Sequence, residues 1–170
     1  MINKILVAVD RSQRSQSVFE HALSLAQATD AKLMLLHILS LTEPEHPITP
    51  NFTYYPLVQL RDYGLYQREF TRYERHGLEF LRHIAREAEK NGIKPEFTQL
   101  TGNPGQIICE LAHNWSADLI VVGSRGLKGL KEMFLGSVSN YVTHHANCSV
   151  FIVRQLLDSA SETASAQAEL

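Results

Sequence analysis

Short runs rich in valine, isoleucine and leucine alternate with segments of helical periodicity along most of this chain. Four runs are strongly apolar: Ile5 to Val9, Lys32 to Leu39, Leu119 to Val122 and Val150 to Val153. Strands of this kind are typical of parallel sheets that helices cover on both faces. In a weaker run, Pro95 to Leu100, Phe97 and Gln99 alternate with Glu96 and Thr98, which predicts a more exposed strand.

The segments between these runs repeat apolar residues at helical spacing. Asn91-Gly92 predicts the end of the second helix, and Asn103-Pro104 predicts the cap and the first residue of the third. The four predicted helices are Val18 to Ala26, Phe70 to Ala88, Pro104 to Trp115, and a last one that begins at Gly136-Ser137. The whole pattern predicts an α/β fold: a Rossmann-like, open, doubly wound sheet of five parallel strands with helices on both faces.

Residues 1–154 are expected to form a single domain with one irregular connection. That connection, from about Ser40 to Tyr66, carries four prolines and an aromatic cluster and is unusually long for a compact domain. It is interpreted either as a lid or interface or as a passive surface excursion. Residues 155–170 are rich in alanine, serine and glutamate, which predicts a disordered tail.

Charge and composition narrow the class of protein. Sixteen basic against eighteen acidic residues give a formal net charge of -2, which argues against nucleic acids and anionic membranes as partners. No apolar run approaches the ~20 residues needed to span a bilayer, and the N-terminus lacks the features of a signal peptide, so a cytoplasmic protein is expected. The two cysteines, Cys109 and Cys148, lack CxxC spacing and are interpreted as buried or half-buried thiols.

The segment after the fourth strand has the spacing Gly123-x2-Gly126-x9-Gly136-Ser137. Ligands of open α/β sheets bind beyond the carboxyl ends of the strands, and glycines let the backbone approach them closely. Gly136-Ser137 opens a helix whose first N–H groups favour an anion, and Ser137 and Ser139 add hydroxyl donors. These features predict a phosphate-binding cradle. The same glycines are ordinary turn formers, and Gly-Ser is an ordinary helix start, so the spacing alone leaves both interpretations open.

Motifs of several enzyme classes are absent. The sequence has no GxxxxGK[ST] pattern, no GxGxxG after a strand and no GxSxG elbow. His144-His145 have no partners at metal-ligand spacing, so no protein-borne metal site is expected, and His37 is interpreted as a core histidine. No general base for a water at a γ-phosphate is evident, so any ATP hydrolysis is expected to be slow.

Together with the glycine spacing, several segments resemble the universal stress protein family. They are the opening Ile5-Leu6-Val7-Ala8-Val9-Asp10-x-Ser12, the turn Gly102-x-Pro104 and the strand entry Ala117-Asp118-Leu119-Ile120-Val121-Val122-Gly123. The resemblance covers roughly residues 1 to 154. It implies strand order 3-2-1-4-5 and an ATP-type ligand, since the glycine signature marks the nucleotide-binding subset of the family. Arg11 departs from the family, which commonly has glycine at that position.

The resemblance also implies a site, position by position. Asp10 is expected to contact the ribose, with the N-cap of the following helix as its alternative role. The backbone of Ile38 is expected to meet the adenine ring, and Val122 to abut the nucleoside. The residues expected to line the ribose and phosphates are Gly123, Arg125, Gly126, Gly136, Ser137, Val138 and Ser139. A divalent cation, Mg²⁺ or Mn²⁺, is expected to bridge phosphate oxygens.

The expected function is a regulatory or stress-response role, exerted through nucleotide-dependent conformation and association. The resemblance implies a homodimer through the fifth strand, Ser149 to Arg154, whose apolar edge would otherwise be open. Two alternatives stay open: a slow ATPase or autophosphorylating enzyme, and a nucleotide-free dimeric scaffold in which the glycine loop is only structural. The sequence does not select among ATP, ADP, AMP and cyclic AMP.

Overall fold

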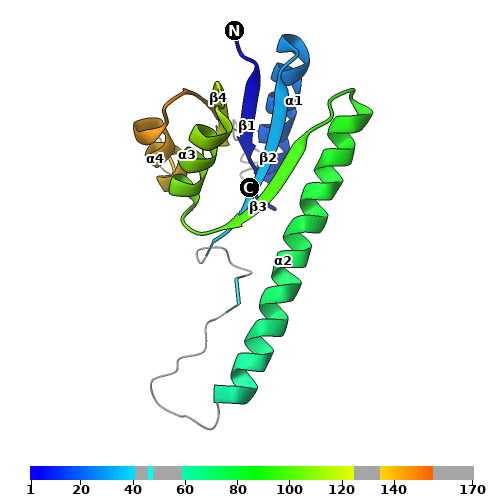
Figure 1. Ribbon diagram of the computed structural model, residues 1–170, viewed down its shortest axis with the longest axis vertical. Coiled ribbons are helices and arrows are strands. Elements are labelled where there is room, and N and C mark those ends of the chain that lie inside the picture. Colours follow the sequence, from blue (N-terminus) through cyan, green and yellow to red (C-terminus); the bar gives the residue numbers. More distant parts are fainter. Residues whose placement is uncertain (41–45, 48–58, 125–134, 155–170) are drawn as a thin grey trace, which may run out of the picture.

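The computed structural model of the chain describes residues 1–40, 46–47, 59–124 and 135–154. Strands and helices alternate along it, as predicted (Figure 1). The strands are β1 Lys4–Ala8, β2 Lys32–Leu39, β3 Glu96–Thr101, β4 Leu119–Gly123 and β5 Ser149–Val153. The helices are α1 Gln13–Thr29, α2 Gln59–Lys90, α3 Pro104–Trp115 and α4 Ser137–His145.

The strands form one parallel sheet in the order β3-β2-β1-β4-β5, which confirms the predicted fold class and strand order. β1 lies at the centre, where Val7 pairs with Leu35 of β2 and with Val121 of β4. β3 forms one edge, and Phe97 on it is 42% exposed. The prediction of a more exposed third strand is therefore confirmed.

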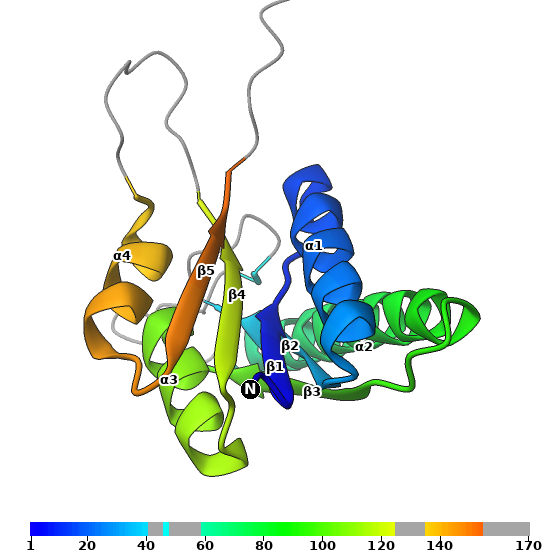
Figure 2. The same ribbon diagram turned by 90° about the horizontal axis from the view of Figure 1, so that it is seen from above.

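Helices cover both faces of the sheet (Figure 2). α1 and α2 lie on one face, over a buried cluster that includes Val7 and Phe19. α3 and α4 lie on the other, over a cluster that includes Leu6, Ile108 and Val142. Because successive strand residues point to opposite faces, a central strand covered on both sides must be apolar at nearly every position.

The predicted end of α2 and the predicted start of α3 both show the expected backbone features. Gly92 follows α2 with a φ of 82°, a conformation that favours glycine. Asn103 is the N-cap of α3 and Pro104 its first residue, although the Asn103 side chain makes no capping hydrogen bond.

Helix α2 begins earlier than the sequence predicts and extends past the sheet (Figure 1). Its first residue, Gln59, lies inside the connection expected from Ser40 to Tyr66. Leu81 and Ile84 are buried against the sheet, whereas residues 64–72 are exposed or half-buried and Leu65 is 53% exposed. The apolar periodicity that predicts a helix arises from burial, so it marked only the part of α2 that the sheet covers. Among the described residues, no helix combines the length and apolar character needed to cross a membrane.

Part of the connection between β2 and α2 packs back on this helix. The ring of His46 lies edge-on to the rings of Phe70 and Tyr73, with centroids 6.0 and 5.6 Å apart. Tyr73 is 4% exposed. Residues 41–45, 48–58 and the predicted tail 155–170 lie outside the described part of the chain.

Candidate functional site

The strand order reverses between β1 and β4, at the centre of the sheet. From β1 the chain crosses to β2 on one side, and from β4 it crosses to β5 on the other. Ligands of open α/β sheets usually bind at such a reversal, beyond the carboxyl ends of the strands. Because the strands are parallel, α1 and α4 both begin at this end of the sheet (Figure 2).

Asp10 follows β1 and precedes α1, and two serines hold it there. Its backbone N–H donates to the Ser15 hydroxyl at 2.8 Å, and its Oδ1 accepts from the backbone N–H of Ser12 at 2.9 Å and from the Ser12 hydroxyl. The N-cap position of α1 belongs to Ser12 and not to Asp10. The carboxylate is thus fixed at the end of β1, where the sequence placed a contact with ribose.

Ile38 and Val122 lie near the carboxyl ends of β2 and β4. Their side chains are 7% and 3% exposed and belong to the cluster between the sheet and the pair α3 and α4. A residue whose side chain is buried in the core can offer a ligand mainly its backbone N–H and C=O groups. That is the kind of contact expected for Ile38, and with its side chain buried Val122 has only its backbone to offer as well.

Gly123, the last residue of β4, has a structural reason to be glycine. A Cβ at this position would lie 2.9 Å from Cγ2 of Val18 in α1, closer than carbon atoms pack. The lack of a side chain at Gly123 therefore lets α1 pack against β4, whether or not a ligand is bound.

The N-cap residue of α4 supplies no side-chain cap. Gly136 is the N-cap, with φ −59° and ψ 157°, and the first turn contains no acidic residue. Ser137 is exposed and Val138 half-buried, while Ser139 is 1% exposed and its hydroxyl donates to the carbonyl of Gly136 at 3.0 Å. The first N–H groups of a helix have no partner within it. Backbone N–H groups, rather than the Ser139 hydroxyl, are thus the donors that this helix end presents to an anion.

The structure brings most of the predicted site residues to one end of the sheet. They are Asp10, Ile38, Val122, Gly123, Gly136, Ser137, Val138 and Ser139. Arg125 and Gly126 lie outside the described residues. Within the described ranges, no three His, Cys, Asp or Glu side chains are grouped so that they could hold a metal ion.

Two residues to which the sequence gave no role at the site support the end of β1. Ser15 is 5% exposed and accepts the Asp10 N–H, a contact between residues that no motif had linked. His37 is 1% exposed, and its Nδ1 lies 3.2 Å from the carbonyl oxygen of Val9. The interpretation of His37 as a core histidine is confirmed. The one signal for it was a polar residue within an apolar run.

Comparison with known proteins agrees with this arrangement. The profile of the Universal stress protein family matches residues 1–154. The chain belongs to the universal stress protein family. The universal stress protein Sll1388 of Synechocystis sp. is 38% identical over 151 residues, which cover 89% of this chain and 97% of that relative.

Solved structures extend the comparison to the fold of the universal stress proteins. The hypothetical protein MJ0577 superposes with a TM-score of 0.72 at 23% identity, over 93% of this chain and 99% of that one, which shows the shared fold. A universal stress protein from Arabidopsis thaliana with AMP bound has a TM-score of 0.59 at 27% identity, over 92% and 94% of the two chains. A universal stress protein in complex with cAMP has a TM-score of 0.59 at 25% identity, over 89% and 96%.

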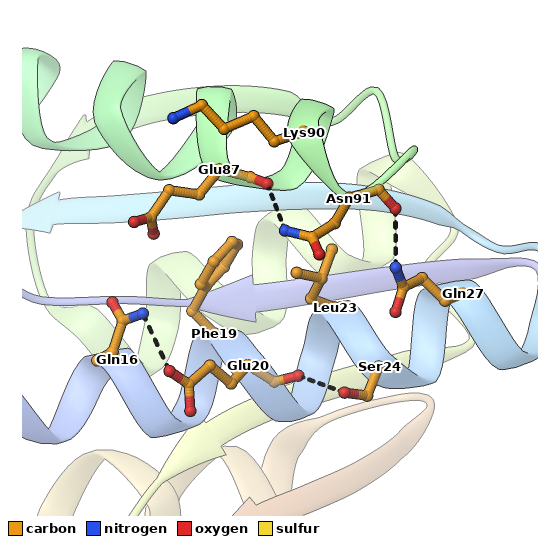
Figure 3. Close-up of a pocket in the computed structure, with 9 residues that line it drawn as sticks. All are labelled: Gln16, Phe19, Glu20, Leu23, Ser24, Gln27, Glu87, Lys90 and Asn91. Atoms are coloured by element: carbon orange, nitrogen blue, oxygen red, sulfur yellow. Dashed lines mark hydrogen bonds between the residues drawn. The ribbon is translucent and has the colours of Figure 1, made fainter.

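A groove of about 380 Å³ lies outside the part of this universal stress protein that carries the family signature (Figure 3). It runs between α1 and the end of α2, over the buried side chains of Phe19 and Leu23. Its polar residues bond to each other: Gln27 Nε2 donates to the carbonyl of Asn91 at 2.7 Å, and Asn91 Nδ2 donates to that of Glu87 at 2.8 Å (Figure 3). None of the predicted site residues lines it, and we interpret it as a packing groove between two helices.

Proposed function

We propose that this universal stress protein binds an adenine nucleotide at the carboxyl ends of β1, β2 and β4. In this proposal Asp10 contacts the ribose, the backbone near Ile38 meets the adenine, and the N-terminus of α4 holds the phosphates. The segment from Gly123 to Ser139, Arg125 and Gly126 included, completes the phosphate contacts. The role is regulatory: the bound nucleotide changes conformation or association in a stress response.

The observation that carries the proposal is the open N-terminus of α4. Its N-cap is a glycine, which has no side chain to cap the helix, and its first turn has no acidic residue. A helix start presents unpaired N–H groups and a partial positive charge, which together favour a phosphate. The Asp10 carboxylate, held at the end of β1 by Ser12, is suited to sugar hydroxyls. The site thus offers a negative group for the ribose and positive groups for the phosphates.

The nucleotide complexes of relatives support the same ligand class. The Arabidopsis protein holds AMP and another universal stress protein holds cAMP, so an adenine nucleoside monophosphate unit is common to both. We propose ATP or a shorter adenine nucleotide as the ligand here, with Mg²⁺ or Mn²⁺ bound through its phosphate oxygens rather than through protein carboxylates.

The test is a valine at position 136. Gly136 has an extended backbone that any residue adopts, so Gly136→Val places bulk at the mouth of α4 without backbone strain. We expect the affinity for ATP, measured by titration calorimetry with Mg²⁺, to fall at least about tenfold. Position 123 is unsuitable for this test, because a side chain there meets Val18 and disturbs the fold.

The control is the same substitution at Gly64, a glycine of α2 around which the structure leaves open space. Gly64→Val should keep the affinity of the unaltered protein, and thermal unfolding without nucleotide should show that both variants are folded. Mass analysis of nucleotide released by denaturing the purified protein identifies the ligand. Unchanged affinity in folded Gly136→Val would overturn the assignment of the phosphates to α4.

We also propose that the protein is a homodimer joined along β5, from Ser149 to Arg154. β5 is an edge strand, and its residues Ser149 and Phe151 are exposed. An apolar edge strand is normally paired or covered.

A further inference from the structure

The two cysteines, far apart in the sequence, lie on the same side of the sheet. Cys109 is in the middle of α3, and Cys148 is in the short segment between α4 and β5. Both are half-buried and pack against the cluster that α3 and α4 cover. In the structure both are free thiols.

Two contacts between α3 and the α4 region bracket Cys109. One turn before it, Gly105 lies so close to Tyr141 that a Cβ would be 2.7 Å from the Tyr141 ring. One turn after it, Nδ1 of His113 lies 3.4 Å from Nδ2 of Asn147. Residues four apart in a helix lie on one face. The face of α3 that carries Cys109 therefore lies along α4 and the segment that follows it, and Cys148 comes directly after Asn147.

The electrostatics of the thiols agree with this proximity. Burial raises the pKa of both Cys109 and Cys148 above the ordinary value. The charge of Glu110 raises the pKa of Cys109 further, and the charges of Cys109 and Asp118 raise that of Cys148. Each thiol is thus mainly protonated at neutral pH, and disulfide exchange, which needs a thiolate, should quicken as the pH rises.

We propose that Cys109 and Cys148 form a reversible disulfide within one chain, which joins α3 to the segment between α4 and β5. A disulfide brings the two Cα atoms to about 4.4–6.8 Å. Cys148 lies beyond the last residue of α4, in a segment of irregular backbone that can adjust to this distance. The bond would fix the position of α4 against α3.

The oxidant is a low-molecular-weight disulfide such as oxidised glutathione. One cysteine thiolate attacks a glutathione sulfur, a mixed disulfide forms and one glutathione leaves as a thiolate. The second cysteine thiolate then attacks the protein sulfur of that mixed disulfide, and the second glutathione leaves. The two protein thiols lose two protons and two electrons, and the two glutathione molecules take them up.

The experiment treats the full chain with oxidised glutathione at about pH 7 and about pH 9, then alkylates free thiols and analyses the unreduced digest by mass spectrometry. We expect a peptide pair cross-linked through Cys109 and Cys148, and faster formation at the higher pH. Mass analysis of the denatured, undigested protein should show a single chain lighter by two hydrogen atoms. A dithiol reductant should restore both thiols. Cys109→Ser and Cys148→Ser should each retain a glutathione adduct on the remaining cysteine.

Three results would overturn the proposal: glutathione adducts alone on the unaltered protein, cross-links only between two chains, or two cysteines that stay free at both pH values. Because these readouts involve no nucleotide, their failure would leave the proposed nucleotide site untouched.

Discussion

The two glycines of α2 stand in opposite surroundings. A Cβ at Gly77 would overlap Oε1 of Gln99 and lie 2.7 Å from Cδ2 of His37, whereas one at Gly64 would meet no atom within 4 Å. Gln99 is tied to the carbonyl of Glu74 at 3.0 Å, and His37 is buried, so neither can move away freely. Glycine at position 77 therefore allows α2 to approach β2 and β3.

Alanine at each of these positions tests that approach. Gly77→Ala should destabilise the protein by ~1–3 kcal/mol, since overpacking displaces His37 and Gln99. Gly64→Ala should instead stabilise it by up to ~1 kcal/mol, because alanine is the better helix former. The measurement is the free energy of unfolding in urea. Equal stabilisation by both variants would contradict the close approach of α2 to the sheet.

At the residue scale, the sequence predicted which residues come together at the candidate site better than it predicted the contacts among them. Asp10 and the Gly136-Ser137 helix start follow from a motif, because their order along the chain is enough to recognise them. The bond from Ser139 to the carbonyl of Gly136 and the crowding of Gly123 by Val18 were not predicted. Such contacts depend on rotamers and on which helix crosses which strand, and neither can be read from spacing.

Among the elements, α3 and α4 meet through a glycine and a ring. Cδ1, Cγ and Cβ of Tyr141 would all lie within 3.0 Å of a Cβ at Gly105. The Tyr141 ring also stacks on the ring of His145, with the two centroids 3.9 Å apart. The contact sets how closely α4, with the proposed phosphate site at its start, can approach α3.

A double-mutant cycle measures this contact. Gly105→Ala should cost ~1–3 kcal/mol of unfolding free energy, because the added methyl group collides with the Tyr141 ring. In a Tyr141→Ala background the same change should cost at least ~1 kcal/mol less, since the ring is gone. Urea unfolding of the four proteins gives the coupling. Additive effects would mean that the two residues do not touch.

Burial also explains which elements the sequence could predict. All five strands were placed within one residue of their bounds: four because runs such as Leu119 to Val122 are strongly apolar, and β3 from a weaker, more polar pattern. The start of α2 was placed too late, because its first turns lie beyond the sheet and need no continuous apolar face. Apolar periodicity appears where the core needs a buried helix face, so the part of a helix that lies beyond the sheet does not show it.

For the whole molecule, the two edges of the sheet differ in kind. β3 reads Glu-Phe-Thr-Gln-Leu-Thr, in which only Phe97 and Leu100 are apolar, while β5 reads Ser-Val-Phe-Ile-Val. Each edge carries one exposed phenylalanine: Phe97 on β3 is 42% exposed and Phe151 on β5 is 39% exposed. The two residues therefore form a matched pair for testing which edge joins two chains.

We predict that Phe151→Lys converts the protein from dimer to monomer and that Phe97→Lys leaves the dimer intact. A lysine on an edge strand opposes strand pairing, because its charge would be buried between the two chains. Light scattering at micromolar protein concentration should show a dissociation constant raised at least about tenfold for Phe151→Lys alone. Since the rings of Phe151 and His21 lie 6.2 Å apart, thermal unfolding must show that this variant keeps its fold. A monomeric unaltered protein would overturn the proposed dimer. Dissociation caused by Phe97→Lys instead would place the interface away from β5.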